Sequence, residues 1–230
     1  MAASKPPAAS MASADEKWGR LQATVHERLD TTANYADTVA RVVDTLWTWE
    51  QRRDAQAALL DRDARSPFYR ILWDDYRMSE HYAQTDSHRE FMVRSFDRLG
   101  GYLPAVTRRA AEDHDLSKYE LVEAVGYTLR WVHGRQGVHW LEALGHHYGV
   151  QEHHPQFFIM GKTGLGLMST DALQESLVDM VACRWERQLE GRQDVTNSEL
   201  VDIAPGFFDR YQVADRAAVQ ALIDKIARQE

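Results

Sequence analysis

Apolar side chains recur three and four residues apart along most of the chain, and this helical spacing is the strongest constraint on its fold. Trp18, Leu21, Val25 and Leu29 show the pattern near the start. Alternating runs of Val, Ile and Thr bounded by turn residues, which are typical of strands, are almost missing. The sequence therefore predicts an all-α protein.

Capping residues and helix breakers divide this pattern into separate helices. Asp86 or Ser87 is expected to cap one of them, and Thr170 or Asp171 another. Ser117, with a Glu three residues later, predicts a capping box. The expected helices cover about 17–30, 34–60, 67–81, 87–99, 103–111, 117–132, 138–148, 171–185, 198–211 and 214–228.

The distribution of histidine separates an N-terminal part from a functional part. Only His26 and His81 precede residue 84, and the histidine-rich part begins at His88. The length of 230 residues suits one large domain, or one domain with an added helical layer. We expect a disordered tail over 1–16, a helical extension over 17–83, a metal-binding core over 84–190, and C-terminal helices packed on that core over 191–230.

The composition argues against several classes of protein. A formal net charge of −8 argues against binding of the nucleic-acid backbone, which requires an excess of Lys and Arg. No apolar stretch has the length of a transmembrane helix, and the Ala-, Ser- and Pro-rich start lacks the apolar centre of a secretory signal. We therefore expect a cytoplasmic protein without membrane association. The single cysteine, Cys183, excludes an internal disulfide and a Cys-rich zinc site, and its apolar neighbours predict a buried core thiol.

Histidines are concentrated in the middle of the chain. Seven of the ten lie between His114 and His154, and they include two doublets seven residues apart, His146-His147 and His153-His154. His114 is followed at once by Asp115. Because imidazole and carboxylate are common ligands of Zn, Fe, Mn and Ni ions, this concentration predicts a metal centre, with two ions as the preferred interpretation.

The order of these residues resembles that of the HD-domain superfamily of metal-dependent phosphohydrolases, over about residues 84–190. The order is one His, an adjacent His-Asp pair, further His residues and a distal Asp: His88, His114-Asp115, His147, His153-His154 and Asp179. The resemblance implies an HD-like helical bundle, here with an N-terminal helical extension.

Two branches of that superfamily share local motifs with this chain. Residues 114–118, His-Asp-Leu-Ser-Lys, are similar to the His-Asp-x-x-Lys element of the cyclic-dinucleotide phosphodiesterase branch. That branch also carries a Gly-Tyr-Pro element, and the tripeptide does not occur here, so this specificity is not implied. Residues 147–155 resemble a small HD-like branch of unknown function, in which Asn commonly stands where this chain has Gln151.

The resemblance implies a ligand set for each ion. His88, His114, Asp115 and Asp179 would hold the first ion. Asp115 would bridge to a second ion, which His147 and His153 would hold. His154 would be either a third histidine ligand of that ion or a substrate contact. His147 is preferred over His146, because adjacent residues of a helix point about 100° apart. The cofactor would be one or two ions of Fe, Mn, Ni, Zn or Mg.

The preferred function is hydrolysis of a phosphate ester, with a nucleotide among the candidate substrates. The substrate would be a small anionic molecule, Asp115 would hold the ions that activate a water molecule, and Lys118 would stabilise the charge that develops on the phosphoryl group. Considered alone, Lys118 is also consistent with a solvated surface lysine, and Asp179 with an ion pair to Arg184.

Two alternatives belong to other classes. Similar His and Asp sets in the superfamily hold mixed-valent di-iron and activate oxygen, so an oxygenase acting on a small polar or phosphonate substrate is the second hypothesis. The third is a non-catalytic binding module with a residual site. The sequence leaves the choice of metal and the formation of a homo-oligomer open.

Overall fold

The computed structural model describes residues 71–160 and 166–229. It divides the chain into two compact units, Met1–Tyr76 and Arg77–Glu230. In the first unit the described residues are the π-helix η1 (Ile71–Asp75) and Tyr76. The expected tail over 1–16, the expected helices over 17–30 and 34–60 and most of the expected extension lie outside the described residues. The second unit contains every candidate ligand.

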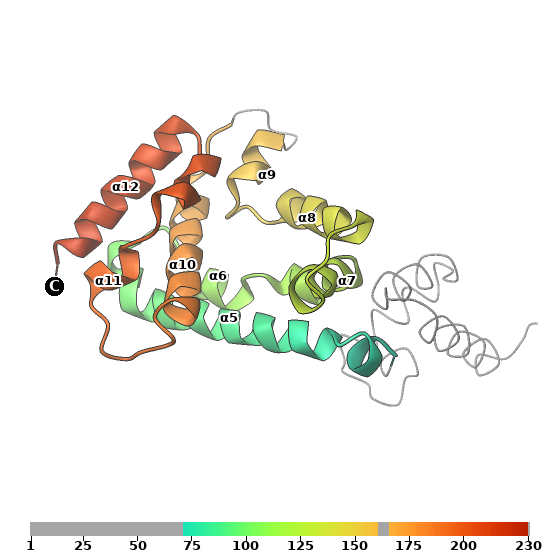
Figure 1. Ribbon diagram of the computed structural model, residues 1–230. Coiled ribbons are helices and arrows are strands. Elements are labelled where there is room, and N and C mark those ends of the chain that lie inside the picture. Colours follow the sequence, from blue (N-terminus) through green and yellow to red (C-terminus); the bar gives the residue numbers. More distant parts are fainter. Residues whose placement is uncertain (1–70, 161–165, 230) are drawn as a thin grey trace, which may run out of the picture. The chain divides into compact units, whose positions relative to one another are not determined.

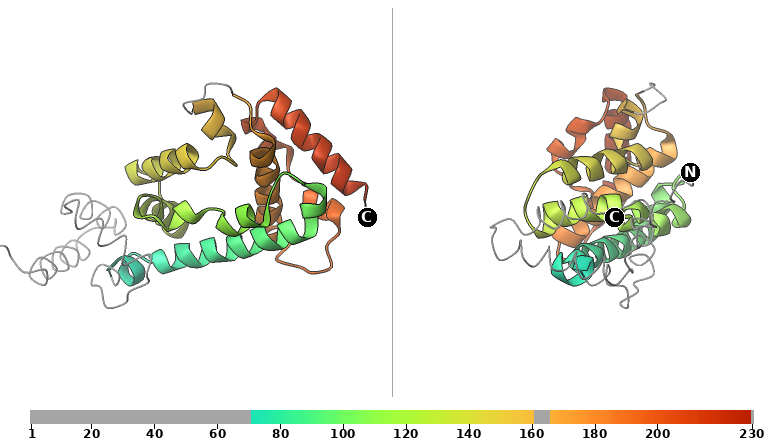
Figure 2. Two further views of the ribbon diagram at one scale, coloured as in Figure 1. Left: turned by 180° about the vertical axis from the view of Figure 1, so that it is seen from behind. Right: turned by 90° about the vertical axis from the view of Figure 1, so that its right-hand side faces the viewer.

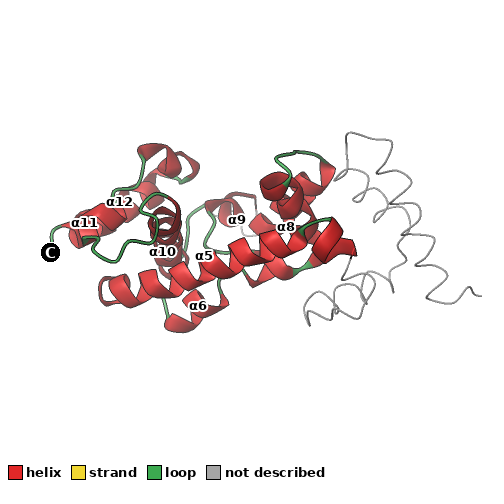
Figure 3. Cartoon of the chain, turned by 60° about the horizontal axis from the view of Figure 1, so that its bottom comes forward, coloured by secondary structure: helices red, strands yellow, loops and turns green. Residues whose placement is uncertain are grey.

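The regular structure described in the second unit consists only of helices (Figure 3). The prediction of an all-α fold is therefore confirmed for the part of the chain that is described. None of its helices is both long enough and apolar enough to cross a membrane. The elements are α5 (Met78–Leu99), η2 (Gly100–Tyr102), α6 (Arg108–Asp113), η3 (Leu116–Tyr119), α7 (Leu121–Tyr127), η4 (Thr128–Val132), α8 (Val138–Val150), α9 (Pro155–Met160), α10 (Thr170–Arg187), α11 (Asn197–Val201), η5 (Pro205–Arg210) and α12 (Val213–Ala227).

The long helix α5 contacts helices along most of the second unit (Figure 1). The pair α7 and α8 lies toward its N-terminal end, and α10 crosses it toward its C-terminal end with α11 and α12 beyond (Figure 2). One apolar core joins α5 and α10 to the C-terminal helices. Its buried members include Met92, Leu99, Leu177, Val181 and Ile226. The α10 helix therefore belongs both to this core and, through its other face, to the candidate site.

The structure has one continuous helix, α5, where the sequence predicts a boundary between two helices. The sequence predicts a break before a cap at Asp86 or Ser87, but α5 continues through both residues and also crosses 83–84, where the metal-binding core is expected to begin. The polar side chains have other partners: Asp86 accepts a hydrogen bond from Tyr119, and Ser87 donates one to Glu186. The helix instead begins after Arg77, whose φ of 58° interrupts the expected helix over 67–81.

The predicted capping box at Ser117 is wrong. Residues Leu116–Tyr119 form the 3₁₀ helix η3, and α7 begins only after Glu120. The Ser117 hydroxyl accepts a hydrogen bond from Gln151 Nε2 at 2.7 Å instead of capping a helix. This long-range partner ties the segment after α8 to the His114–Lys118 motif, and a pattern of local residues cannot reveal it.

Other helix boundaries also differ from the sequence expectation. The helix expected over 103–111 is the shorter α6, which is capped by Thr107. Ser169, one residue earlier than expected, caps α10. The helix expected over 198–211 is divided into α11 and η5, because Pro205 begins a new helical segment.

A close approach of α7 and α8 depends on Gly126. A Cβ atom at this position would collide with the carbonyl oxygen of His139 and with the Cβ of Ala143, both on α8. The two helices carry residues that meet in the candidate site, Glu123 on α7 and His147 on α8. The missing side chain at Gly126 therefore sets the distance between them.

We expect Gly126→Ala to destabilise the protein. Overpacking should cost about 1–3 kcal/mol, which exceeds the gain of roughly 1 kcal/mol in helix propensity. Gly145→Ala is the matched control, since Gly145 lies on the exposed side of α8 with open space around its Cβ position. The measurement is the free energy of unfolding of the helical signal in urea, and equal stability of the two variants would contradict this account.

Candidate metal centre

The backbone turns sharply at the His-Asp pair. His114 follows the last residue of α6, and Asp115 adopts the left-handed conformation with φ 57° and ψ 23°. Arg89 holds this turn by donating hydrogen bonds to the carbonyl oxygens of His114, at 3.0 Å, and Glu112. A left-handed residue other than Gly is strained and is often found at functional sites. The turn lets two adjacent side chains, both almost completely buried, face the same space.

The first set of donors surrounds one oxygen of Asp115. Asp115 Oδ2 lies 3.4 Å from His114 Nε2 and 4.0 Å from His88 Nε2. Asp179 Oδ1 completes the set, 3.1 Å from His88 Nε2 and 3.8 Å from His114 Nε2. These four side chains come from α5, the turn after α6, and α10.

The second set of donors faces the other oxygen of the same carboxylate. Asp115 Oδ1 lies 3.5 Å from His147 Nε2 and 3.7 Å from His153 Nε2. His154 joins them, with its Nε2 at 2.8 Å from His147 Nε2. The structure thus brings all seven residues that the sequence analysis selected as metal ligands into one place.

The distances and the unpartnered atoms suit bound metal ions. Two ligand atoms that share an ion are about 3.0–3.5 Å apart when each metal bond is about 2.1 Å, which is close to the spacing in both sets. Three atoms of these donor sets are buried and have no hydrogen-bond partner: His114 Nε2, His153 Nε2 and Asp115 Oδ1. Each buried atom left in this state costs about 1–3 kcal/mol. These buried groups could hold a metal ion, which would supply the missing partner.

Three carboxylates that the sequence analysis missed orient the imidazoles. Glu123 Oε2 lies 2.9 Å from His147 Nδ1, and Glu175 Oε1 lies 3.0 Å from His114 Nδ1 and 3.5 Å from His153 Nδ1. Glu186 Oε2 lies 3.6 Å from His88 Nδ1. When the imidazole is neutral, a carboxylate beside Nδ1 keeps the proton there, so that the Nε2 lone pair is free to face the centre.

Signals for these carboxylates exist in the sequence. Glu175 lies four residues before Asp179, and Glu186 lies seven residues after it, so all three occupy one face of α10. Glu123 stands between apolar neighbours in a short helix and is completely buried. A charged residue at a core position of a helix, such as Glu123, therefore indicates a buried and paired carboxylate, as it does at Asp179.

The remaining candidates have distinct places around the centre. Lys118, the predicted charge-stabilising residue, lies with its Nζ 2.5 Å from Asp115 Oδ2 and above the ring of Tyr127. His146 points away from the donor sets and binds Glu123 Oε1 at 2.7 Å, as expected from its position beside His147. Cys183, expected to be a buried core thiol, is half-buried, with its Sγ 3.6 Å from Asp179 Oδ1.

Electrostatics separate the imidazoles into two groups. Burial lowers the pKa of His114, but Asp115, Glu175 and Asp179 outweigh burial and raise it to about 9. Burial also lowers the pKa of His88, but its hydrogen-bond partners, with Asp179 first among them, outweigh burial and hold this pKa well above its usual range. Burial and the neighbouring imidazoles instead lower the pKa of His153 and hold that of His154 well below its usual range. His88 and His114 therefore carry protons near neutral pH when no metal is bound, whereas His153 and His154 are neutral.

We expect metal binding to release protons. An ion can bind the first set only after His88 and His114 lose their protons, and the pKa of His114 is about 9. Affinity should therefore rise from about pH 6 to about pH 9, with about two protons released per first ion near neutral pH. Titration calorimetry in two buffers of different ionisation enthalpy measures this number, and an affinity independent of pH would contradict the assignment.

We expect Glu123→Gln to weaken binding of the second ion by about 10- to 100-fold, because the neutral amide is a poorer acceptor for His147. Glu142→Gln is the matched control, since Glu142 is exposed and pairs only with the side chain of His139 among the described contacts. Competition with a chromophoric chelator measures both affinities. Equal affinities in a folded Glu123→Gln protein would show that the carboxylate does not support the site.

No curated protein and no solved structure matches the chain. Residues 77–203 match a family of unknown function, DUF5662. The match covers more than half of the chain and all seven candidate ligands, so the chain belongs to this family of unknown function.

Proposed function

We propose that the protein is a metal-dependent phosphohydrolase with an HD-like centre of two ions. The observation that carries the proposal is the position of Asp115, whose two oxygens face two separate sets of imidazole nitrogens. A carboxylate in this position is suited to bridge two ions. When bound, two such ions bind phosphoryl oxygens and lower the pKa of a water molecule.

The residues of the centre would have separate roles in binding the ions and the substrate. His88, His114 and Asp179 would hold one ion, and the second would be held by His147, His153 and His154. Lys118 would bind a phosphoryl oxygen as a compact point charge, since its ammonium lies beside the Asp115 carboxylate. Five carboxylates lie in or around the centre, so a phosphate ester would be repelled unless the cations offset their charge. These carboxylates are Asp115, Glu123, Glu175, Asp179 and Glu186.

An oxygenase is the second candidate, because three imidazoles in the second set suit iron as well as zinc or manganese. The two functions differ in what they consume. The protein loaded with iron would take up oxygen in the presence of a phosphonate if it were an oxygenase. A hydrolase would release inorganic phosphate from esters without oxygen uptake, and a binding module would do neither.

We expect Lys118→Met to lower kcat for p-nitrophenyl phosphate by about 100-fold while the metal content stays unchanged. The reason is that the lysine would stabilise charge in the transition state without binding the ions. Lys225→Met is the matched control, because Lys225 lies on α12 and contacts the carbonyl oxygen of Tyr102. Oxygen uptake without phosphate release would replace the hydrolase proposal with the oxygenase, and the absence of both activities would favour the binding module.

A further inference from the structure

Three hydrogen bonds of Gln151 join the second donor set to the His-Asp motif. Its backbone N–H donates to the carbonyl oxygen of His147, at 3.0 Å, where α8 ends. Its carbonyl oxygen accepts a hydrogen bond from the backbone N–H of His154, at 3.2 Å. Its side-chain amide donates to the hydroxyl oxygen of Ser117, at 2.7 Å. Gln151 therefore holds the backbone on both sides of the turn that leads from His147 to His153 and His154.

Ser117 links Gln151 to the carboxylate that orients His147. Ser117 is buried, and it lies two residues after Asp115. Burial raises the pKa of Glu123, but its hydrogen bonds, first from His147 and also from Ser117, outweigh burial and lower this pKa. The single hydroxyl proton of Ser117 is therefore directed to Glu123, and the hydroxyl oxygen accepts from Gln151. This arrangement requires a hydrogen-bond donor at Gln151, which its amide N–H supplies.

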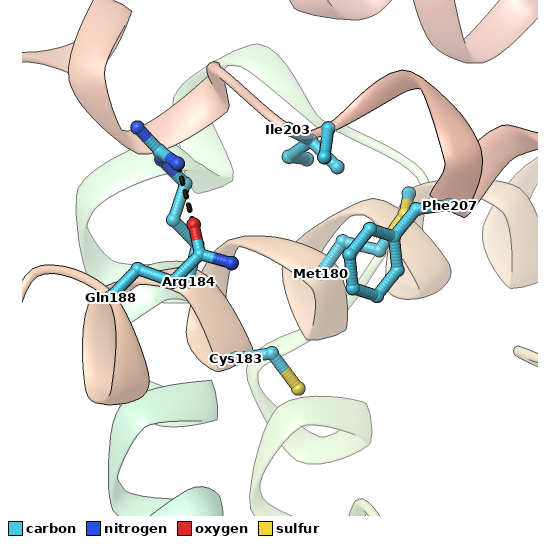
Figure 4. A pocket seen from close by; sticks show the side chains of 7 residues that line it. Met180, Cys183, Arg184, Gln188, Ile203 and Phe207 are labelled. Atoms are coloured by element: carbon cyan, nitrogen blue, oxygen red, sulfur yellow. Dashed lines mark hydrogen bonds between the residues drawn. The ribbon is translucent and has the colours of Figure 1, made fainter.

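The first donor set is held by a different part of the fold. Its Asp179 lies on α10, and Arg184 of the same helix joins α10 to the segment after α11 by donating to Asp202 Oδ2 at 3.0 Å. Gln188 accepts a further hydrogen bond from Arg184, at 2.7 Å, as Figure 4 shows. A change of the Gln151 side chain should therefore affect the second donor set without moving Asp179.

We propose that Gln151 is a positioning residue for the second ion, and that its side-chain amide acts by holding the segment after α8 against Ser117. The inference rests on the two-ion centre of the proposed function and not on the reaction. Asp115 Oδ1 lies 3.5 Å from His147 Nε2 and 3.7 Å from His153 Nε2. A metal ion needs each donor at about 2.1 Å. A displacement of this segment relative to Asp115 therefore weakens binding of the second ion.

Gln151→Met removes the amide donor and keeps the length of the side chain. In titrations with Mn²⁺, we expect this variant to bind the first ion as the wild type does and the second ion about tenfold more weakly. Competition with a chelator measures both affinities, and electron paramagnetic resonance distinguishes a spin-coupled pair of ions from a single ion. Gln188→Met is the matched control, since it also removes a glutamine hydrogen bond of 2.7 Å, and it should change neither affinity.

Ser117→Ala tests whether Gln151 acts through the hydroxyl group. This smaller change should also weaken the second ion, because it removes the acceptor of the Gln151 amide and the hydroxyl donor to Glu123. Combining it with Gln151→Met should weaken the second ion no further than Ser117→Ala alone, since the two residues share one hydrogen bond. An unchanged second affinity in Ser117→Ala, or additive losses in the double variant, would overturn the proposed link.

The outcomes separate the role of Gln151 from the proposed function. Equal second-ion affinities of the wild type and a folded Gln151→Met protein, or an equal loss at both ions, would overturn the positioning role and leave the hydrolase proposal intact. A wild-type protein that binds only one ion at saturation would overturn both. If the expected pattern is found but no phosphate ester is hydrolysed, the hydrolase proposal fails and the positioning role stands.

Discussion

The buried carboxylate of Asp115 is the feature on which the rest of the site depends. Its left-handed backbone conformation brings His114 and Asp115 into one space, and each of its oxygens faces a different group of imidazoles. Burial raises the pKa of this carboxyl group, but His114 and Lys118 outweigh burial and hold it well below its usual range. A charge buried at this depth requires compensation by cations. Lys118 supplies part of it, and bound metal ions would supply the rest.

The helical scaffold holds the donors by contacts that lie outside the donor sets. The missing side chain at Gly126 lets α8 approach α7, which brings His147 to Glu123. Arg89 on α5 fixes the turn of the His-Asp pair through backbone carbonyl oxygens. The α10 helix buries Val181 in the apolar core and presents Asp179 to the centre from another face. Packing of the helices and geometry of the site are therefore coupled, since a shift of α7 or α10 would move a donor.

The all-α class and the residues that meet in the centre could be predicted from the sequence, because helical spacing is a local property and the His and Asp order resembles a known superfamily. Their role as ligands and the relation to that superfamily stay predictions. Helix boundaries could not be predicted where a polar residue has a distant partner, as Ser117 has in Gln151. Glu123 and Glu175 were missed for a related reason: their role depends on imidazoles that lie far away in sequence.

Anomalous diffraction from crystals of the metal-loaded protein tests the central claim most directly. The account predicts two metal peaks, each bound by one oxygen of Asp115, with His88 and Asp179 at one ion and His147 at the other. Data collected on both sides of the absorption edge would identify the element in each position. A single ion bound away from Asp115, or an Asp115 carboxylate that contacts only Lys118 in fully loaded protein, would contradict it.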